Sequence, residues 1–186
     1  KTAVAVGRLA AELGLEFIGD GDALIQRVDA ADAPTSGSLC FAKNAAWSAR
    51  AGRLAILITS AASVVEREGP TLLSSQPRLD FARALGLLES WAGFVWSDAE
   101  PVIHPTARIG RNVVIGRGVH IGAGTVIYHN AVIGDEVIIG QRCVIKSCAV
   151  VGEEGFGFER DSQSKAVRLP HIGTVVIGDE VEVGSL

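Results

Sequence analysis

The sequence predicts two units of different fold class, a mixed α/β unit over residues 1–98 and an all-β parallel β-helix over residues 99–186. Two observations support this prediction. From residue 103 onward, an isoleucine or valine recurs at every sixth position, whereas the first hundred residues show short helical and strand patterns without a fixed repeat. A period of six matches neither the 3.6-residue period of a helix nor the two-residue period of a strand.

The six-residue repeat continues without a slip through nine aliphatic positions. They are Ile103, Ile109, Ile115, Ile121, Ile127, Ile133, Ile139, Ile145 and Val151. From Ile109 onward, a small or β-branched residue stands two positions before each of them. Residues two apart on a strand face the same side, so we expect both positions to point inward. A short strand and a corner every six residues, with three sides per turn, give a coil of about 18 residues, as in hexapeptide β-helices.

Glycine follows the repeated aliphatic residue at most of these positions. The glycines are Gly110, Gly116, Gly122, Gly134, Gly140 and Gly152, and the exceptions are His104, Tyr128 and Lys146. We interpret the glycines as corner residues, because glycine tolerates backbone angles that other residues avoid. A β-sandwich with chance spacing is disfavoured, since its strands need longer and less regular intervals.

The first unit contains segments typical of alternating helices and strands. Leu9, Leu13 and Phe17 have helical spacing, in a helix expected to end near Gly14 or Gly19. Residues 23–32 alternate between apolar and polar as a strand does, and residues 54–59 are a short apolar run typical of a buried strand. Residues 77–91 have helical periodicity, and residues 97–105, with two prolines, are expected to form a linker.

Composition restricts the partners of the protein. A net charge of −4 without any run of Lys or Arg argues against nucleic acid. No apolar stretch reaches about 18 residues, so we expect no transmembrane segment. The cysteines Cys40, Cys143 and Cys148 form no CxxC motif, which favours the reducing cytoplasm over a disulfide scaffold. No two histidines have a ligand spacing such as HxxxH, so we expect no metal site.

The repeat is interrupted after Val151 and resumes at Ile177, a spacing that is not a multiple of six. The polar, glycine-rich segment 152–173 must therefore loop out of the coil. Two interpretations stay open. The excursion is either a surface hairpin without a role in a site, or a wall over a cleft between subunits.

The order of motifs along nearly the whole chain resembles one enzyme family. Residues 19–22 are GDGD, residues 39–47 are LCFAKNAAW, residues 76–88 are QPRLDFARALGLL, and the excursion contains GFGF and closes on LPHIG. From about residue 7 to the end, this resembles the UDP-3-O-(3-hydroxyacyl)glucosamine N-acyltransferases of the lipid A pathway. Many acyltransferases share the hexapeptide repeat, so the N-terminal unit discriminates.

This resemblance implies a left-handed β-helix, a homotrimer and a cytoplasmic enzyme without a cofactor. The implied reaction transfers a 3-hydroxyacyl chain from acyl carrier protein to the 2-amino group of UDP-3-O-acylglucosamine. The family pattern Phe-x-x-Asn-x-x-Tyr, which holds the uracil, matches Phe41, Asn44 and Trp47. Tryptophan in place of tyrosine keeps the stacking surface and loses the hydroxyl.

The resemblance also implies a wall of the active site. Its expected members are His129, Glu154, Gly155, Phe156, Gly157, Phe158 and His171. The two Gly-Phe pairs match the family loop. Glu154 stands where the family usually has Asp, and His171 where it more often has Gln.

No histidine in this sequence is expected to be the catalytic base. The family places that base, the usual proton acceptor near neutral pH, in an Ala-His-Asn stretch on a later coil, and the sequence contains none. His104 and His120 are expected at the surface. We therefore expect a fragment or truncated form without activity of its own. Glu154 and a short run of coils leave open two alternatives, an acyl-CoA-dependent N-acyltransferase of another UDP-amino sugar and a non-catalytic UDP-sugar-binding trimer module.

Overall fold

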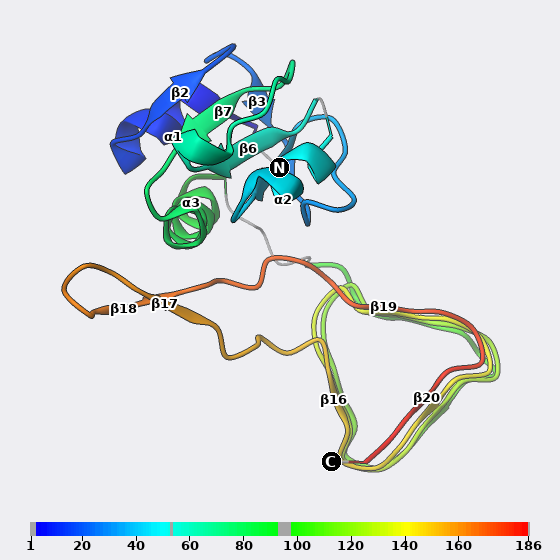
Figure 1. The fold of residues 1–186 in the computed structure, drawn as a ribbon. Helices are drawn as coiled ribbons and strands as arrows, with labels where there is room; N and C mark the ends of the chain where they lie inside the picture. The colour runs from blue at the N-terminus through cyan, green and yellow to red at the C-terminus, as the bar shows by residue number, and fades with distance from the viewer. Residues whose placement is uncertain (1–2, 53, 93–97, 186) are drawn as a thin grey trace. The chain divides into compact units, whose positions relative to one another are not determined.

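The computed structural model describes residues 3–52, 54–92 and 98–185, which form two compact units (Figure 1). One unit comprises residues 1–94 and 156–172, and the other comprises residues 95–155 and 173–186. The sequence suggested a boundary after residue 98, with the excursion counted in the β-helix domain. The contacts instead group the greater part of the excursion with the N-terminal unit.

The N-terminal unit is built on a five-stranded sheet with the order β2–β7–β6–β5–β4. The strands are β2 (Glu16–Ile18), β4 (Arg27–Val28), β5 (Ser38–Phe41), β6 (Ile56–Thr59) and β7 (Thr71–Leu73). Strands β4 to β7 are parallel, and β2 pairs with β7 in the antiparallel direction. A separate antiparallel pair joins β1 (Val4–Ala5) to β3 (Leu24–Ile25). The expected buried strand over residues 54–59 is confirmed by β6, all four residues of which are buried.

Helices cover both faces of this sheet. Leu39 and Phe41 of β5 pack in the same cluster as residues of α1 (Val6–Leu13) and α3 (Pro77–Ala92). Cys40, between them on the strand, packs in a second cluster, to which α2 (Ala45–Arg50) contributes Trp47. The short 3₁₀ helix η1 (Ala61–Ser63) contacts α2. Alternate residues of a strand face opposite sides, so the two clusters lie on opposite faces of the sheet.

The first helix ends at the earlier of its two expected ends. Gly14 adopts a left-handed conformation with φ 65°, and its N–H donates to the carbonyls of Ala10 and Ala11, which closes α1. Phe17 has helical spacing in the sequence but lies in β2, beyond this cap. Of the two expected ends, Gly14 is confirmed, and Phe17 lies outside the helix despite its helical spacing.

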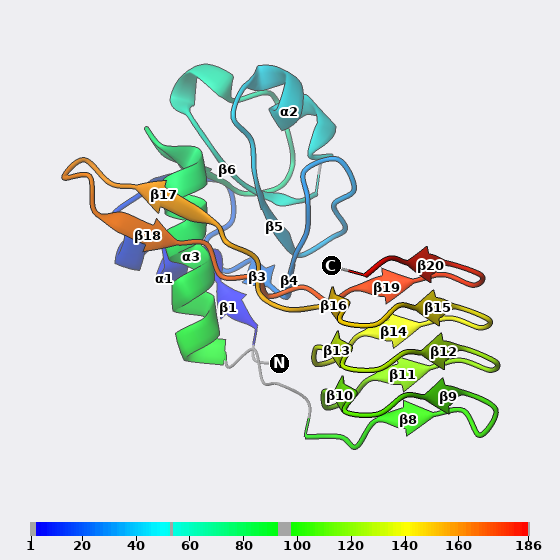
Figure 2. The ribbon, with the colours of Figure 1, turned by 90° about the horizontal axis from the view of Figure 1, so that it is seen from below.

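The second unit is a parallel β-helix with three sheets (Figures 1 and 2). Its sheets have the orders β19–β14–β11–β8, β20–β15–β12–β9 and β10–β13–β16. The strands are β8 (Val102–Ile103), β9 (Arg108–Ile109), β10 (Val114–Ile115), β11 (His120–Ile121), β12 (Val126–Ile127), β13 (Val132–Ile133), β14 (Ile138–Ile139), β15 (Val144–Ile145), β16 (Val150–Val151), β19 (Val176–Ile177) and β20 (Glu182–Val183). Ile103 lies beside Ile121, and Ile121 beside Ile139, so the 18-residue coil is confirmed. Part of the expected linker, residues 102–103, is already the first strand of this coil.

The interior of the β-helix is lined by the two positions that the repeat predicts. Ile127, Ile133 and Ile145 are at most 1 % exposed, and the small residues Ala131 and Cys143 are fully buried. The column is more open in the first coil, where Ile103 and Ile109 are 37 % and 38 % exposed. The middle coils therefore contribute most of the apolar burial that holds this unit together.

The glycines of the repeat have a different role from the expected one. The left-handed backbone conformation occurs two residues after most of them, for example at Asn112 (φ 55°) after Gly110 and at Glu136 (φ 58°) after Gly134, and only Gly152 (φ 83°) adopts it itself. At Gly122, φ lies outside that region, but a Cβ atom would lie 2.6 Å from the carbonyl carbon and oxygen of Gly140. Glycine is required at Gly122 because the next coil passes so close. The conformational explanation holds at Gly152 but was wrong for Gly110, Gly116, Gly122, Gly134 and Gly140.

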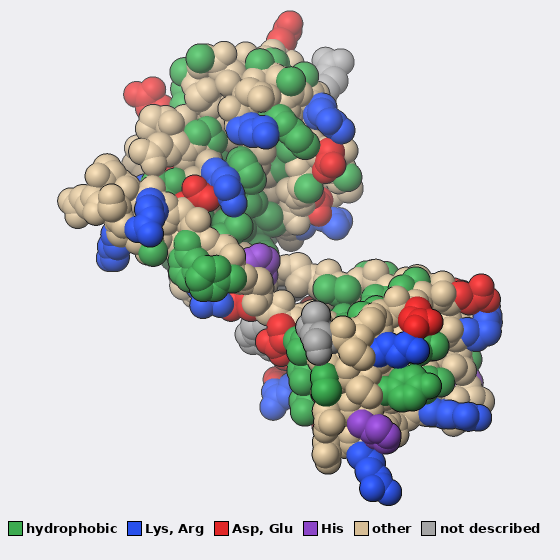
Figure 3. Space-filling view, turned by 60° about the horizontal axis from the view of Figure 1, so that its bottom comes forward, with side chains coloured by type: hydrophobic (Ala, Val, Ile, Leu, Met, Phe, Trp, Pro, Cys, Tyr) green, Lys and Arg blue, Asp and Glu red, His purple; other side chains and the backbone are tan. Residues whose placement is uncertain are grey.

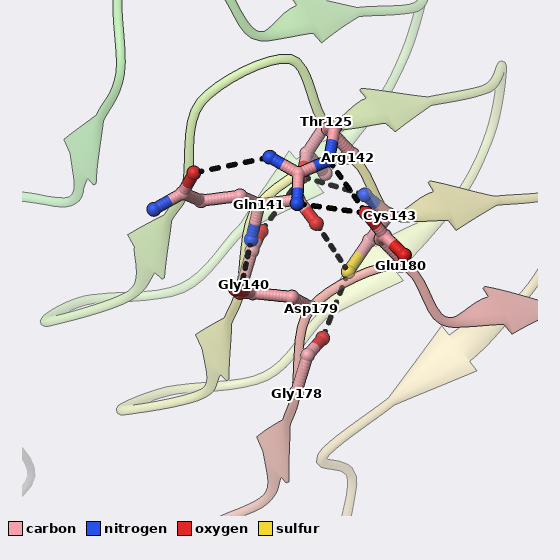
Figure 4. Close-up of polar contacts among 8 residues, drawn as sticks. All are labelled: Thr125, Gly140, Gln141, Arg142, Cys143, Gly178, Asp179 and Glu180. Carbon is pink, nitrogen blue, oxygen red and sulfur yellow. Dashed lines mark hydrogen bonds and ion pairs between the residues drawn. The ribbon is translucent and has the colours of Figure 1, made fainter.

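Polar groups join coils on either side of the excursion (Figure 4). Inside the coil, the Thr125 hydroxyl donates to the Gly140 carbonyl at 2.7 Å and accepts from the Cys143 N–H at 3.1 Å. The Cys143 thiol donates to the Gly178 carbonyl at 3.0 Å. At the adjacent corner, the Arg142 guanidinium pairs with Glu180 at 2.7 Å. The polar atoms of Thr125 and Cys143 thus have hydrogen-bond partners, and the coil resumes in register after the excursion.

The excursion is an antiparallel hairpin of β17 (Phe158–Arg160) and β18 (Ala166–Arg168). Both strands contact α3 (Figure 1). Arg78 of α3 forms an ion pair with Glu159 at 3.1 Å, and Leu169 and Ile172 pack against the core of the N-terminal unit. The hairpin is therefore part of the packed N-terminal unit.

Candidate functional site

The two aromatic residues of the expected uracil site pack in different clusters, on opposite faces of the sheet. Phe41 ends β5 and is half-buried, and its ring centroid lies 5.0 Å from that of Phe81 at an interplanar angle of 41°. Trp47 is half-buried in the cluster of the opposite face. Trp47 lies on α2, and residues 43–46 of the segment between the two rings are exposed.

Asn44 links these two residues through the backbone. It is the N-cap of α2, with φ −160° and ψ 173°, and its Oδ1 atom accepts the Trp47 N–H at 3.1 Å. An asparagine at this position satisfies an N–H group that the first turn of a helix leaves unpaired. Asn44 thus fixes the start of the helix that carries Trp47.

Two cations that the sequence analysis did not single out flank Trp47. The Arg50 guanidinium carbon lies 4.8 Å from the centroid of the indole ring, and the Lys43 ammonium nitrogen lies 5.8 Å from it. Both side chains are exposed. The sequence could have indicated the contact of Arg50, because Arg50 follows Trp47 by three residues on a helix. Residues three apart on a helix share a face.

His129 is part of the corner structure of the β-helix. Its Nδ1 atom accepts the Arg111 N–H at 2.8 Å, across one coil. Asp135 and Asp179 accept backbone N–H groups of the preceding coil in the same way, each at 2.8 Å. Because Nδ1 accepts, the neutral imidazole carries its proton on Nε2. His129 therefore has a structural bond on one nitrogen and leaves only Nε2 for a substrate.

Lys146 follows Tyr128, the sequence neighbour of His129, by one coil of 18 residues. Lys146 lies over the Tyr128 ring, with Nζ 5.7 Å from the centroid, and pairs with Glu182 at 3.0 Å. The hydrogen bond and charge of Glu182 raise the pKa of Lys146. Lys146 is thus held as a cation and is unsuited to accept a proton near neutral pH.

The hairpin brings four of the predicted wall residues together. Phe156 is 96 % exposed, and its ring contacts that of Phe158 edge to face at 4.9 Å. At the base of the hairpin, Gly157 accepts the Leu169 N–H at 2.9 Å, and a Cβ atom at Gly157 would lie 3.4 Å from the His171 ring. Phe156, Gly157, Phe158 and His171 therefore belong to one local structure in the N-terminal unit.

Glu154 and Gly155 belong by their contacts to the β-helix unit. Glu154 borders a groove of about 570 Å³ on the outer surface of the sheet β10–β13–β16. The floor of this groove is apolar, with Val114 and Val132, and its edge carries Arg117 and Asp135. Glu154 and the four hairpin residues thus belong to different units. Glu154 lies beside a groove with an apolar floor and charged edges.

Two of the remaining titratable groups, Cys40 and His104, lie in local structural contacts. Within residues 3–52, 54–92 and 98–185, no three His, Cys, Asp or Glu side chains are grouped to hold a metal ion. Burial raises the pKa of the Cys40 thiol to about 11, which leaves it protonated and unreactive. The His104 ring hydrogen-bonds Thr106 at 2.9 Å within its own turn. No helix of the described chain has both the length and the apolar character of a membrane span.

Comparison with known proteins supports the sequence resemblance. Residues 118–153 match the model of the bacterial transferase hexapeptide (six repeats), which agrees with the left-handed β-helix that the resemblance implied. A UDP-3-O-acylglucosamine N-acyltransferase of Coxiella burnetii is 31 % identical over 95 % of this chain, and one of Aromatoleum aromaticum is 34 % identical over the same share.

The chain spans 60 % of the length of each of these relatives. The Coxiella alignment extends over 214 positions, more than the 186 residues of the chain, so this relative contains residues without a counterpart here. The chain therefore contains the bacterial transferase hexapeptide repeat, and nearly its whole length is similar to UDP-3-O-acylglucosamine N-acyltransferases.

Proposed function

We propose that this chain is the nucleotide-binding and partial β-helix portion of a cytoplasmic N-acyltransferase of lipid A biosynthesis. The reaction transfers a 3-hydroxyacyl chain from acyl carrier protein to the 2-amino group of UDP-3-O-acylglucosamine. The observation that carries this proposal is the similarity over 95 % of the chain, which includes the N-terminal unit as well as the widely shared repeat. A fold alone would not carry it.

In this proposal the uracil stacks on Trp47, and Asn44 and Phe41 are the other two residues of the motif that the site would use. The exposed part of the Trp47 ring and its fixed position at the start of α2 support this assignment. As the resemblance implies, we propose that His129, Glu154, Gly155, the Phe156–Phe158 turn and His171 each contact the acceptor or the acyl chain. An aromatic side chain as exposed as Phe156 supports a role in contacting a ligand or partner.

We also propose that the protein assembles as a homotrimer through its β-helix. The outward positions of the sheet β10–β13–β16 are all valines, of which Val114 is 59 % and Val150 is 44 % exposed. Exposed hydrophobic side chains with charged neighbours are visible on the β-helix in Figure 3. An apolar face of this kind supports association of identical copies.

The nucleotide site is tested by titration calorimetry of the chain with UDP-GlcNAc. We expect Trp47→Ala to weaken binding about tenfold or more, because stacking of one base contributes roughly 1–3 kcal/mol. Trp47→Tyr, which restores the residue type of the family pattern, is expected to bind within a few-fold of the unchanged chain. Equal affinity of the unchanged chain and Trp47→Ala, or no binding by either, would refute the assignment.

A second candidate function is a UDP-sugar-binding module without turnover, favoured by the absence of an Ala-His-Asn stretch. We expect no amide product when the chain is incubated with 3-hydroxyacyl-acyl carrier protein and UDP-3-O-acylglucosamine. Product detected by mass spectrometry would show that a base is present after all. Product formed only with an acyl-CoA donor and another UDP-amino sugar would favour the remaining alternative, an acyl-CoA-dependent N-acyltransferase of that sugar.

A further inference from the structure

The indole ring of Trp47 is covered by two exposed cations. Arg50 approaches it from the same helix and Lys43 from the residue before the N-cap. Among the residues that the structure describes, neither cation forms an ion pair with a carboxylate. Their interaction with the ring is a cation–π contact, which is weak at a solvated site. Two exposed positive charges thus lie against the ring on which the base is proposed to stack.

We propose that Lys43 and Arg50 bind the diphosphate of a uridine-diphosphate ligand, an inference that rests on the nucleotide site of the proposed function. A base stacked on Trp47 takes the place of the cations on the ring. The displaced side chains stay tethered within a side-chain length of the phosphates that follow the ribose. Two positive charges then meet the two phosphate groups.

The chemistry of the two side chains fits this role. Arginine presents a planar fork of N–H donors that matches phosphate oxygens, and lysine provides a compact charge for the second phosphate. The protein as a whole has a net charge of −4, so a pair of cations without carboxylate partners is a local feature. Their contact with the Trp47 ring keeps them close to the proposed site.

The experiment measures the affinity of the intact chain for uridine and for UDP by calorimetry at low and high salt. We expect Lys43→Gln and Arg50→Gln each to weaken UDP binding about tenfold, the effect of one charged hydrogen-bonding group. Uridine affinity is expected to stay within twofold or to rise, because a cation no longer competes for the ring. The salt dependence of UDP binding should decrease in both variants.

Arg8→Gln is the matched control. Arg8 is also exposed and also lies over a tryptophan, with its guanidinium carbon 4.3 Å from the centroid of Trp91 in the same unit. Its loss removes one cation and one cation–π contact at a different place. UDP and uridine affinities should both stay unchanged in this variant.

The outcomes separate this inference from the proposed function. If Trp47→Ala weakens uridine binding but the two cation variants keep the UDP-to-uridine affinity ratio, the diphosphate role is wrong and the base site stands. If the cation variants lose uridine and UDP equally, the cations only support the indole ring, and the inference is again wrong. Absence of uridine and UDP binding by the unchanged chain would overturn both proposals.

Discussion

Replacement of Ile133 by alanine is expected to lower the free energy of unfolding of the β-helix unit by about 3–4 kcal/mol. Ile133 is 1 % exposed and lies in the central strand of the sheet β10–β13–β16, between Ile115 and Val151. Its three lost carbon atoms leave a cavity that the coils above and below cannot fill, because their backbones are fixed by the ladder hydrogen bonds. Guanidinium unfolding followed by far-UV circular dichroism measures the change.

Ile109→Ala is the matched control for this substitution. Ile109 occupies the same position of the repeat but is 38 % exposed, so its truncation should cost only about 1 kcal/mol. In a Trp96→Phe background, the fluorescence of Trp47 and Trp91, both in the N-terminal unit, follows that unit separately. Equal losses for Ile133→Ala and Ile109→Ala would contradict a core concentrated in the middle coils.

Replacement of Gly122 by alanine is expected to destabilise the β-helix by about 3 kcal/mol, at the upper end of the cost of overpacking. The added Cβ atom would lie 2.6 Å from the Gly140 carbonyl and 2.8 Å from the Gln141 nitrogen, all backbone atoms that no rotamer change can move. The coils must separate, which lengthens neighbouring ladder hydrogen bonds. Hydrogen exchange at the Gly122 and Val126 amides, which donate to the next coil, should become faster.

Gly178→Ala isolates the cause of this effect. Gly178 follows Ile177 as Gly122 follows Ile121, and no atom of the described chain lies within 4 Å of its added Cβ position. Alanine there should change stability by less than about 1 kcal/mol. Similar losses at both positions would mean that the glycines serve backbone conformation after all, in disagreement with the stacking explanation.

The β-helix could be predicted from the sequence because its contacts repeat. Ile103, Ile121 and Ile139 are neighbours in space at a constant separation along the chain, so the periodicity contains the register. The role of Gly122 could not be read in the same way. Its contact with Gly140 is a distance between backbones, which a sequence pattern does not encode.

Contacts between distant segments were the part that the sequence did not reveal. The excursion was placed correctly along the chain, but its packing on α3 depends on Leu169, Ile172 and the Arg78–Glu159 pair, none of which forms a repeat. The uracil-site residues followed from a motif match alone. Lys43 and Arg50 had no motif, and their relation to Trp47 became visible only once the short helix α2 placed them on the ring.

The docked hairpin also limits how this protein can be taken apart. The chain passes between the two units three times, near residues 94, 155 and 172. A cut near residue 94 would therefore not release an autonomous β-helix, because Leu169 and Ile172 would lose the core that buries them. Recombination or gene fusion at a single junction would face the same obstacle. The two units differ in architecture, but their segments alternate along the chain. Neither unit can therefore be exchanged as one continuous piece of sequence without part of the other.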